Sequence, residues 1–454
     1  MKIQKQYIII FIISLIIFIL ANILTANYSA TIGDETFYMF QAKNILQGKF
    51  LWFEDTSSAL FPIILSPFSY SLPLARIFLS VLTALTATLL FIYAKNQFSK
   101  KVAIFSLIIF LAHPQVLKMS FSLLTEIPFL LLTFIYLLYY EKISIPTVKK
   151  FQILLLGVIF GLALLTKHAA IVLPAALFIT TLASSVSSKE KKKTIFLLIT
   201  TSVIGLLLFL IWPSLAGYNI LQDKITRPDT FFRNMALNSI PSYFLPSFLG
   251  LLILSLLFGK YKSKNYFFLI NFVIIYLFIM LTFINFFFVR YFFVTLPFLS
   301  IIIGIGLTKI YNKKQYIAII LLAIFLIHAA ISLPILKQEY NNHYYFNKPN
   351  CENLKSFTSD CSPYNLEIPY FSQPDNSICS YATTFTTQEQ IASIIISYAD
   401  DNAEIYLDNQ NIGQANTWEE ATIPVTLNPG THTFKAIIIN GNNIGGLGQV
   451  LTCK

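Results

Sequence analysis

Charged residues are scarce in this sequence. Asp, Glu, Lys and Arg together make up 12% of the 454 residues, whereas hydrophobic residues make up 56%. Soluble globular domains contain about 25% charged residues. The composition therefore excludes an ordinary soluble protein and favours a polytopic α-helical membrane protein.

The long apolar segments carry no Asp, Glu, Lys or Arg in their central parts. A helix needs about 20 residues to span a membrane, and eleven segments approach this length: 7–26, 74–94, 102–118, 124–140, 151–166, 169–186, 194–212, 243–259, 266–287, 291–308 and 315–336. The first is interpreted as a retained span, because it is longer than the core of a cleaved signal peptide. His328, deep in the last segment, is interpreted as a packed residue. Ion-coupled carriers place charge near the middle of the bilayer, so this pattern weighs against a carrier.

Positive charge lies between the apolar segments. The net charge is +11, and the lysines cluster in alternate connections: Lys95–Lys101, Lys142–Lys150, Lys189–Lys193, Lys260–Lys264 and Lys309–Lys314. Lysine-rich connections face the cytoplasm. We therefore expect a multi-pass protein of the cell membrane, in contact with the lipid bilayer, with a cytoplasmic N-terminus and an extracellular C-terminal domain. The lysines are not interleaved with base-stacking aromatic residues, so no nucleic-acid partner is expected.

Cysteine is absent from all eleven apolar segments. Its four occurrences follow the last segment, at Cys351, Cys361, Cys379 and Cys453. The same region alternates polar and apolar residues, as in "EIYLD" and "THTFKAIIIN", which predicts short antiparallel strands. We therefore expect a membrane domain over 1–336, a linker over 337–365 and an all-β sandwich over 366–454.

An even number of cysteines in an exterior domain predicts two disulfides. The sequence leaves their pairing open. We expect Cys351–Cys361, which closes a short local loop, and Cys379–Cys453, which ties the beginning of the domain to its end.

Ionisable residues gather at the predicted exterior ends of the spans. Asp34 and Glu35 follow the first span, Glu126 lies at the turn between the third and fourth, Lys167 follows the fifth and Arg290 precedes the tenth. Each has an ordinary interpretation, as a solvated loop acid or as a cation that snorkels to the interface. His113 and His168 are interpreted as packing or hydrogen-bonding residues. The shared side of the charged set indicates a site at the membrane surface, for a substrate with an apolar tail and an anionic head.

The motifs that carry these residues resemble those of the GT-C glycosyltransferases, in the branch of protein O-mannosyltransferases and aminoarabinose transferases. "DETFYMFQAKNILQGKF" followed by "FPIILSPF" is similar to the first exterior loop of that family. "LLTEIPF" resembles its second acidic motif, "GLALLTKHAAIVLP" its "GLA.LTK" turn, and "VRYFFVTLP" its late Arg-Tyr-Pro stretch. The four motifs occur in family order. His168 stands where the family often has Gly, so this turn departs from the family pattern.

The resemblance implies the GT-C fold and an inverting transfer of a sugar from a polyprenyl-phosphate donor to a protein, lipid or glycan acceptor. Asp34 matches the family's base, and Glu126 would position the acceptor or support that base. Glu35, Lys167 and Arg290 would bind substrate, the two cations by holding the lipid phosphate. No metal-ligand motif such as HExxH occurs, and the branch does not generally require a metal. A divalent cation at the exterior acidic cluster, with Glu54 and Asp55, is left as an option.

The C-terminal region resembles the galactose-binding-like β-sandwich of many glycan-active enzymes, through "SYATTFTTQEQIASIIISYADDNAEIYLDNQNIG" and the later "LNPGTH". Such sandwiches either bind sugar or serve as structural appendages. An alternative from another class is a non-enzymatic transporter or receptor that displays a lectin-like domain. Convergence of Asp34, Glu126 and Arg290 on one site would favour the enzyme.

Overall fold

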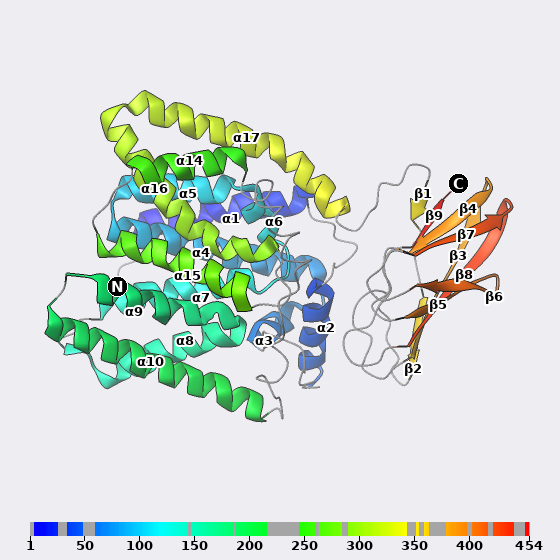
Figure 1. The fold of residues 1–454 in the computed structure, drawn as a ribbon, viewed down its shortest axis with the longest axis horizontal. Helices are drawn as coiled ribbons and strands as arrows, with labels where there is room; N and C mark the ends of the chain where they lie inside the picture. The colour runs from blue at the N-terminus through cyan, green and yellow to red at the C-terminus, as the bar shows by residue number, and fades with distance from the viewer. Residues whose placement is uncertain are drawn as a thin grey trace. The chain divides into compact units, whose positions relative to one another are not determined.

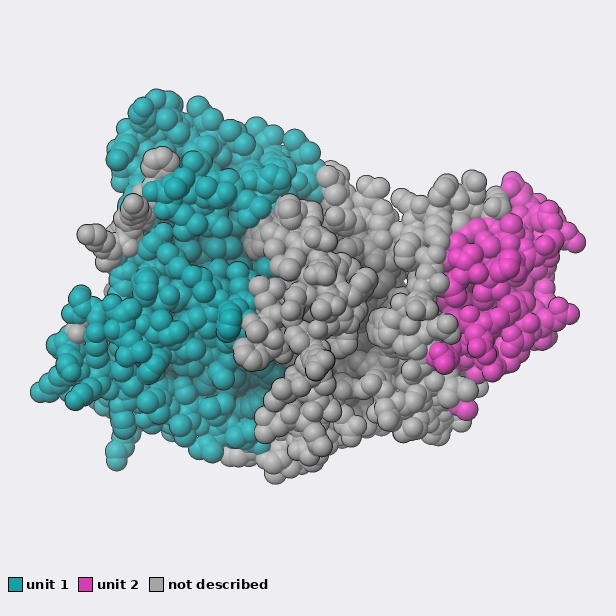
Figure 2. Space-filling view, in the orientation of Figure 1, with its two compact units in different colours: residues 1–28, 41–333 teal, residues 29–40, 334–454 magenta. Residues whose placement is uncertain are grey.

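A computed structural model of the chain separates into two compact units, which are described one at a time. Unit 1 comprises Met1–Tyr28 and Gln41–Leu333, and unit 2 comprises Ser29–Phe40 and Pro334–Lys454 (Figure 2). The structure describes residues 4–25, 34–48, 60–143, 147–185, 187–215, 245–258, 263–283, 289–342, 351–353, 358–362, 378–396, 402–415, 421–439 and 450–453.

Unit 1 is built from α-helices (Figure 1). Each of the eleven predicted spans contains a described helix: α1 (Lys5–Thr25), α4 (Leu72–Gln97), α5 (Lys100–Ala112), α7 (Glu126–Lys142), α8 (Lys150–Thr166), α9 (Val172–Ala183), α10 (Ser188–Leu215), α14 (Pro246–Phe258), α15 (Lys264–Phe283), α16 (Leu296–Lys313) and α17 (Gln315–Asn342). Apolar runs fold this way because a helix satisfies its backbone hydrogen bonds internally, as lipid demands. Among the described residues, five helices are long and apolar enough to cross a membrane by length and composition alone.

Short helices connect these long ones. They are α2 (Asp34–Leu46), α3 (Leu60–Leu65), η1 (Ser66–Phe68), α6 (Pro114–Met119), η3 (His168–Ile171) and η4 (Val289–Thr295). The three histidines that we interpreted as packing or hydrogen-bonding residues have such contacts. The Nδ1 atom of His113 accepts the N–H of Gln115 at 3.2 Å, the ring of His168 packs against Phe209, and His328 hydrogen bonds with Ser247 at 2.9 Å.

Helix α16 lies in the middle of unit 1. Its residues from Leu296 to Thr308 are all buried, and it packs against α5 on one side and α14 on another. Glycine permits both contacts, since a Cβ at Gly304 would lie 2.8 Å from the carbonyl oxygen of Val102, and one at Gly306 would lie 2.5 Å from the Cα of Ser255. The backbone of α16 is therefore held closely by its neighbours.

The β domain in unit 2 consists of two antiparallel sheets. The strands are β1 (Cys351–Asn353), β2 (Thr358–Ser362), β3 (Ile378–Thr387), β4 (Ile391–Ile396), β5 (Ala403–Leu407), β6 (Gln410–Ala415), β7 (Ala421–Leu427), β8 (Gly430–Ile439) and β9 (Val450–Cys453). One sheet has the order β1-β9-β4-β7 and the other β2-β3-β8-β5-β6. A single core, which includes Ile394 and Ile423 from the first sheet and Ile405 and Phe434 from the second, joins them as a sandwich.

The strands change two expectations. First, β1 and β2 fall in the range 337–365 that we expected to be a linker, yet β1 pairs with β9 and β2 with β3. Second, the register sets Cys351 opposite Cys453 and Cys361 opposite Cys379, which contradicts the expected pairs Cys351–Cys361 and Cys379–Cys453. Cys453 is disulfide-bonded. Directly opposed residues in an antiparallel pair have Cα separations within the range of a disulfide.

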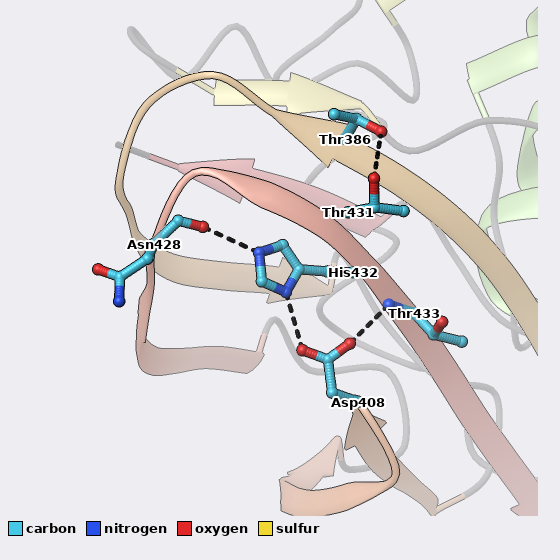
Figure 3. Close-up of polar contacts among 6 residues, drawn as sticks. All are labelled: Thr386, Asp408, Asn428, Thr431, His432 and Thr433. Carbon is cyan, nitrogen blue, oxygen red and sulfur yellow. Dashed lines mark hydrogen bonds and ion pairs between the residues drawn. The ribbon is translucent and has the colours of Figure 1, made fainter.

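A polar cluster ties the β5–β6 turn to β8 (Figure 3). Asp408 and Asn409 form the turn with positive φ angles of 48° and 66°, as a two-residue hairpin of this type requires. The carboxylate of Asp408 accepts the N–H of Thr433 and contacts the Nδ1 atom of His432, each at 2.8 Å. The Nε2 atom of His432 lies 2.9 Å from the carbonyl oxygen of Asn428. The imidazole thus joins the β5–β6 turn, which contains Asp408, to the β7–β8 turn, which contains Asn428.

Candidate active site

A buried ion pair joins two of the predicted site residues. The Nζ atom of Lys167 lies 2.8 Å from the Oε1 atom of Glu126, and the two side chains are 8% and 1% exposed. Glu126 is the first residue of α7 and Lys167 follows the last residue of α8. The short connection between these helices makes them antiparallel, so the start of one meets the end of the other.

The break after α8 positions the lysine. The backbone of Lys167 is extended, with φ −158° and ψ 125°, and its N–H still bonds to the carbonyl oxygen of Ala163. The chain then turns into η3 before α9 begins. Because the helix stops here, the lysine projects from a helix end rather than from a lipid-facing side.

A third segment completes this cluster. The Nζ atom of Lys167 lies 4.5 Å from the ring centroid of Tyr291, a distance at which a cation is attracted to the ring face. Tyr291 belongs to η4, which packs against α7 and leads directly into α16. Arg290 precedes Tyr291 in η4, and its side chain lies outside the described residues. The structure therefore brings together Glu126, Lys167 and the segment that carries Arg290.

The acidic pair lies on α2. Asp34 is the first residue of this helix, and its side chain lies outside the described residues. The side chain of Glu35 is buried, with 3% of its surface exposed. Glu54 and Asp55, the remaining acids of the option for a divalent cation, also lie outside the described residues. Among the residues that the structure does describe, no group of three or more His, Cys, Asp or Glu residues could hold a metal ion.

Sequence reasoning missed one buried cation. Arg76, one turn into α4, is fully buried and is among the largest such side chains. The next turn carries Ser80, whose hydroxyl donates to the carbonyl oxygen of Ser120 at 3.0 Å, so this part of α4 lies beside the connection that leads to α7. An arginine inside an apolar segment was a signal in itself, since such residues are rare and functional. Arg76 lies near the start of the predicted span 74–94, and the sequence analysis gave it no role.

Comparisons with known proteins concern the family and the fold of the chain. Residues 60–212, which include Glu126 and Lys167, match the family model described as dolichyl-phosphate-mannose-protein mannosyltransferase. The fold is similar to that of ArnT from Cupriavidus metallidurans bound to undecaprenyl phosphate, with a TM-score of 0.56 and 13% identity over 77% of this chain and 67% of that chain. No curated protein sequence matches the chain significantly.

A second similar structure is the oligosaccharyltransferase AglB from Archaeoglobus fulgidus, in complex with an inhibitory peptide and a dolichol-phosphate. The TM-score is 0.50 and the identity 14%, over 74% of this chain and 56% of that chain. The chain thus spans about two thirds of the length of ArnT and little more than half of the length of AglB. At such identities the likeness concerns the fold.

Proposed function

We propose that this chain, which has the fold of the GT-C glycosyltransferase superfamily, transfers a sugar from a polyprenyl phosphate to an acceptor with inversion at the anomeric carbon. The two similar structures were solved with lipid phosphates, undecaprenyl phosphate in one and dolichol-phosphate in the other. We assign the same class of donor to this chain. The lysine pattern supports a site on the exterior face of the cell membrane.

The buried pair of Lys167 and Glu126 is the observation that carries this proposal. A sugar leaves its carrier as the polyprenyl phosphate takes the electrons of the broken bond, so a fixed cation must stabilise the departing charge. Lys167 is such a cation, held by Glu126 at 2.8 Å and by the ring of Tyr291. Both residues lie at helix ends. We assign these ends to the exterior side predicted by the lysine pattern, where the phosphate of a lipid donor would lie.

We assign the remaining roles as the sequence motifs suggest them. Asp34 takes the proton of the acceptor hydroxyl, whose oxygen attacks the anomeric carbon from the side opposite the phosphate. Arg290 joins Lys167 in holding the phosphate, and Glu35 binds substrate. The ion pair supports a role for Glu126 in positioning Lys167, which differs from the two roles suggested by the sequence, positioning the acceptor or supporting the base.

Transfer assays test the proposal. Purified protein in nanodiscs receives short-chain polyprenyl phosphates that carry labelled mannose, glucose, galactose or N-acetylglucosamine, together with cell-envelope material of the native host as the acceptor. We expect one donor to be used. Asp34→Asn should still bind it and transfer it about 10²–10⁴ times more slowly, whereas Arg290→Ala should raise the apparent donor KM. The same transfer assay without divalent cations and with EDTA tests the option for a metal ion, because a loss of transfer would show that one is required.

The ion pair has its own test. Lys167→Met should abolish transfer and lower stability by about 3–5 kcal/mol, because it leaves a buried carboxylate without its cation. The double variant Lys167→Met with Glu126→Leu should recover stability but not activity. Lys313→Met, which changes an exposed lysine at the end of α16, is the matched control. Normal transfer by the double variant would contradict the role assigned to the ion pair. No transfer of any donor by the wild type would contradict the proposal itself and favour the non-enzymatic transporter or receptor.

A further inference from the structure

Gln41 carries a buried amide that none of the described residues satisfies. The side chain lies on α2 and is fully buried. Neither its Oε1 nor its Nε2 atom has a hydrogen-bond partner in the described part of the chain. Asn22 pairs with Ser80 at 3.5 Å and Asn271 with Thr180 at 3.2 Å. Among the described residues, the Nε2 atom of Gln6 is also buried without a partner, but only Gln41 has both amide atoms in this state. Gln41 therefore stands out from its surroundings.

The buried amide of Gln41, which has no partner among the described residues, lowers the stability of the folded protein. Burying an amide without compensating hydrogen bonds destabilises a protein by about 1–3 kcal/mol on the basis of mutational data. Native structures contain few such groups, and each calls for an explanation such as a role in binding or catalysis. An apolar residue of similar size would fill the same space without this cost, so the amide indicates a polar ligand.

The position of Gln41 on α2 relates it to the proposed base. Asp34 and Gln41 are seven residues apart, which is close to two full turns, so both lie on one stripe of the helix. Their Cα atoms are about 10 Å apart along the axis, from the rise of 1.5 Å per residue. Helical side chains lean toward the N-terminus, which directs the amide of Gln41 toward the turn that begins with Asp34.

The chemistry of the amide selects the ligand. A carboxamide offers two N–H donors and one carbonyl acceptor. A phosphate only accepts hydrogen bonds and would leave the Oε1 atom without a donor. Two neighbouring sugar hydroxyls can each donate and accept, so they satisfy both ends of the amide. We propose that Gln41 binds a pair of hydroxyl groups of a saccharide at the transfer site, an assignment that rests on the proposed function.

The test removes one partner at a time. The donor that the wild type uses is prepared with each sugar hydroxyl replaced in turn by hydrogen, and binding and transfer are measured for wild type and Gln41→Leu. For the unmodified donor, Gln41→Leu should lower kcat/KM by about 10- to 100-fold, which corresponds to the loss of one or two buried hydrogen bonds. For an analogue that lacks the contacted hydroxyl, the loss should fall below about threefold, because that contact is already absent.

Stability separates a binding role from a structural one. Gln41→Leu should keep or raise the melting temperature, since it removes an unsatisfied amide. Gln47→Leu, the same exchange at an exposed position just after α2, should change neither stability nor transfer. Gln41→Glu, which keeps the shape and loses the donor, provides a second variant should Gln41→Leu fold poorly, and it should show the same dependence on the analogue.

The readouts also identify the source of the hydroxyls. Weaker donor binding by Gln41→Leu, restricted to certain analogues, assigns them to the donor sugar. Unchanged donor binding with a raised acceptor KM assigns them to an acceptor saccharide. Equal losses for every analogue together with a lower melting temperature, or no loss at all, would overturn the assignment. A wild type that transfers no sugar would contradict the proposed function itself, which is a separate result.

Discussion

At the scale of single residues, the protonation state of His432 controls the hydrogen bonds that fix the β5–β6 turn. Both acceptors beside its ring, the Asp408 carboxylate and the Asn428 carbonyl, can only receive hydrogen bonds. Both ring nitrogens must therefore donate, which requires the protonated imidazole. The hydrogen bond to the carboxylate of Asp408, with that to the carbonyl of Asn428, raises the pKa of His432. The hydrogen bonds from His432 and from the Thr433 N–H lower the pKa of Asp408.

These opposite shifts define a pH window. Because the pKa of His432 is raised, its contribution to stability is complete below about pH 6.5, the pKa of a histidine in an unfolded chain. This contribution is lost as the pH rises through the pKa of His432 in the folded protein. A lowered aspartate pKa contributes stability above about pH 4 that is lost as pH falls. We expect hydrogen exchange of the β5–β6 turn in the full protein, corrected for the intrinsic rate, to be slowest between these values.

A variant tests the role of the imidazole. In the His432→Asn variant, the amides of the β5–β6 turn should exchange faster than in the wild type at about pH 6, and their corrected exchange rate should change little up to about pH 8.5. In the wild type, the same amides should lose protection over this interval. Parallel profiles for the two proteins would show that His432 does not control the turn.

The sequence could indicate some site residues and not others. Glu126 and Lys167 interrupt apolar runs, so each was visible as a charge at a helix end. Their pairing depends on which helices pack together, and Tyr291 joins them from a segment more than a hundred residues later. Gln41 has no charge and lies within a short helix, so only its burial without a partner distinguishes it.

At the scale of elements, α16 links packing to the candidate site. Gly304→Val would place side-chain atoms against the Val102 carbonyl, and a helix backbone cannot move aside without separating α5 from α16. We expect a loss of about 1–3 kcal/mol, as for other overpacked cores. Transfer should also fall, because η4 with Tyr291 runs directly into α16.

Gly250→Val is the matched control, since a Cβ at Gly250 in α14 meets no atom within 4 Å. It should leave melting temperature and transfer nearly unchanged. Equal effects of the two substitutions would mean that the loss of glycine, and not the close approach of α5, causes the change.

The short strands of the β domain explain why its beginning was misjudged. β1 has three residues, too few to show alternation, and its partner β9 lies about a hundred residues later. The register predicts the disulfides Cys351–Cys453 and Cys361–Cys379. In the chain-entropy account, the first closes a loop of about 100 residues and contributes roughly 4–5 kcal/mol. Peptide mapping without reduction should recover these two pairs, and recovery of Cys351 with Cys361 would show that the register is wrong.

At the scale of the whole molecule, the lysine pattern makes a prediction about sidedness. Cysteines introduced at Lys192 on α10 and Thr431 on β8 are both at exposed positions. In intact cells an impermeant thiol reagent should label position 431 and not position 192, because lysine-rich connections stay in the cytoplasm. Labelling of position 192 before lysis would reverse the assignment of the membrane faces.

The pairing of β1 with β9 has a consequence for how the β domain can be reused. Its first and last described strands lie side by side in one sheet, so the two ends of the domain meet at neighbouring positions. A domain with adjacent ends tolerates circular permutation and insertion into a loop of another protein. The β domain should therefore fold when it is inserted into a surface loop of an unrelated protein, because its two ends can join neighbouring residues of that loop.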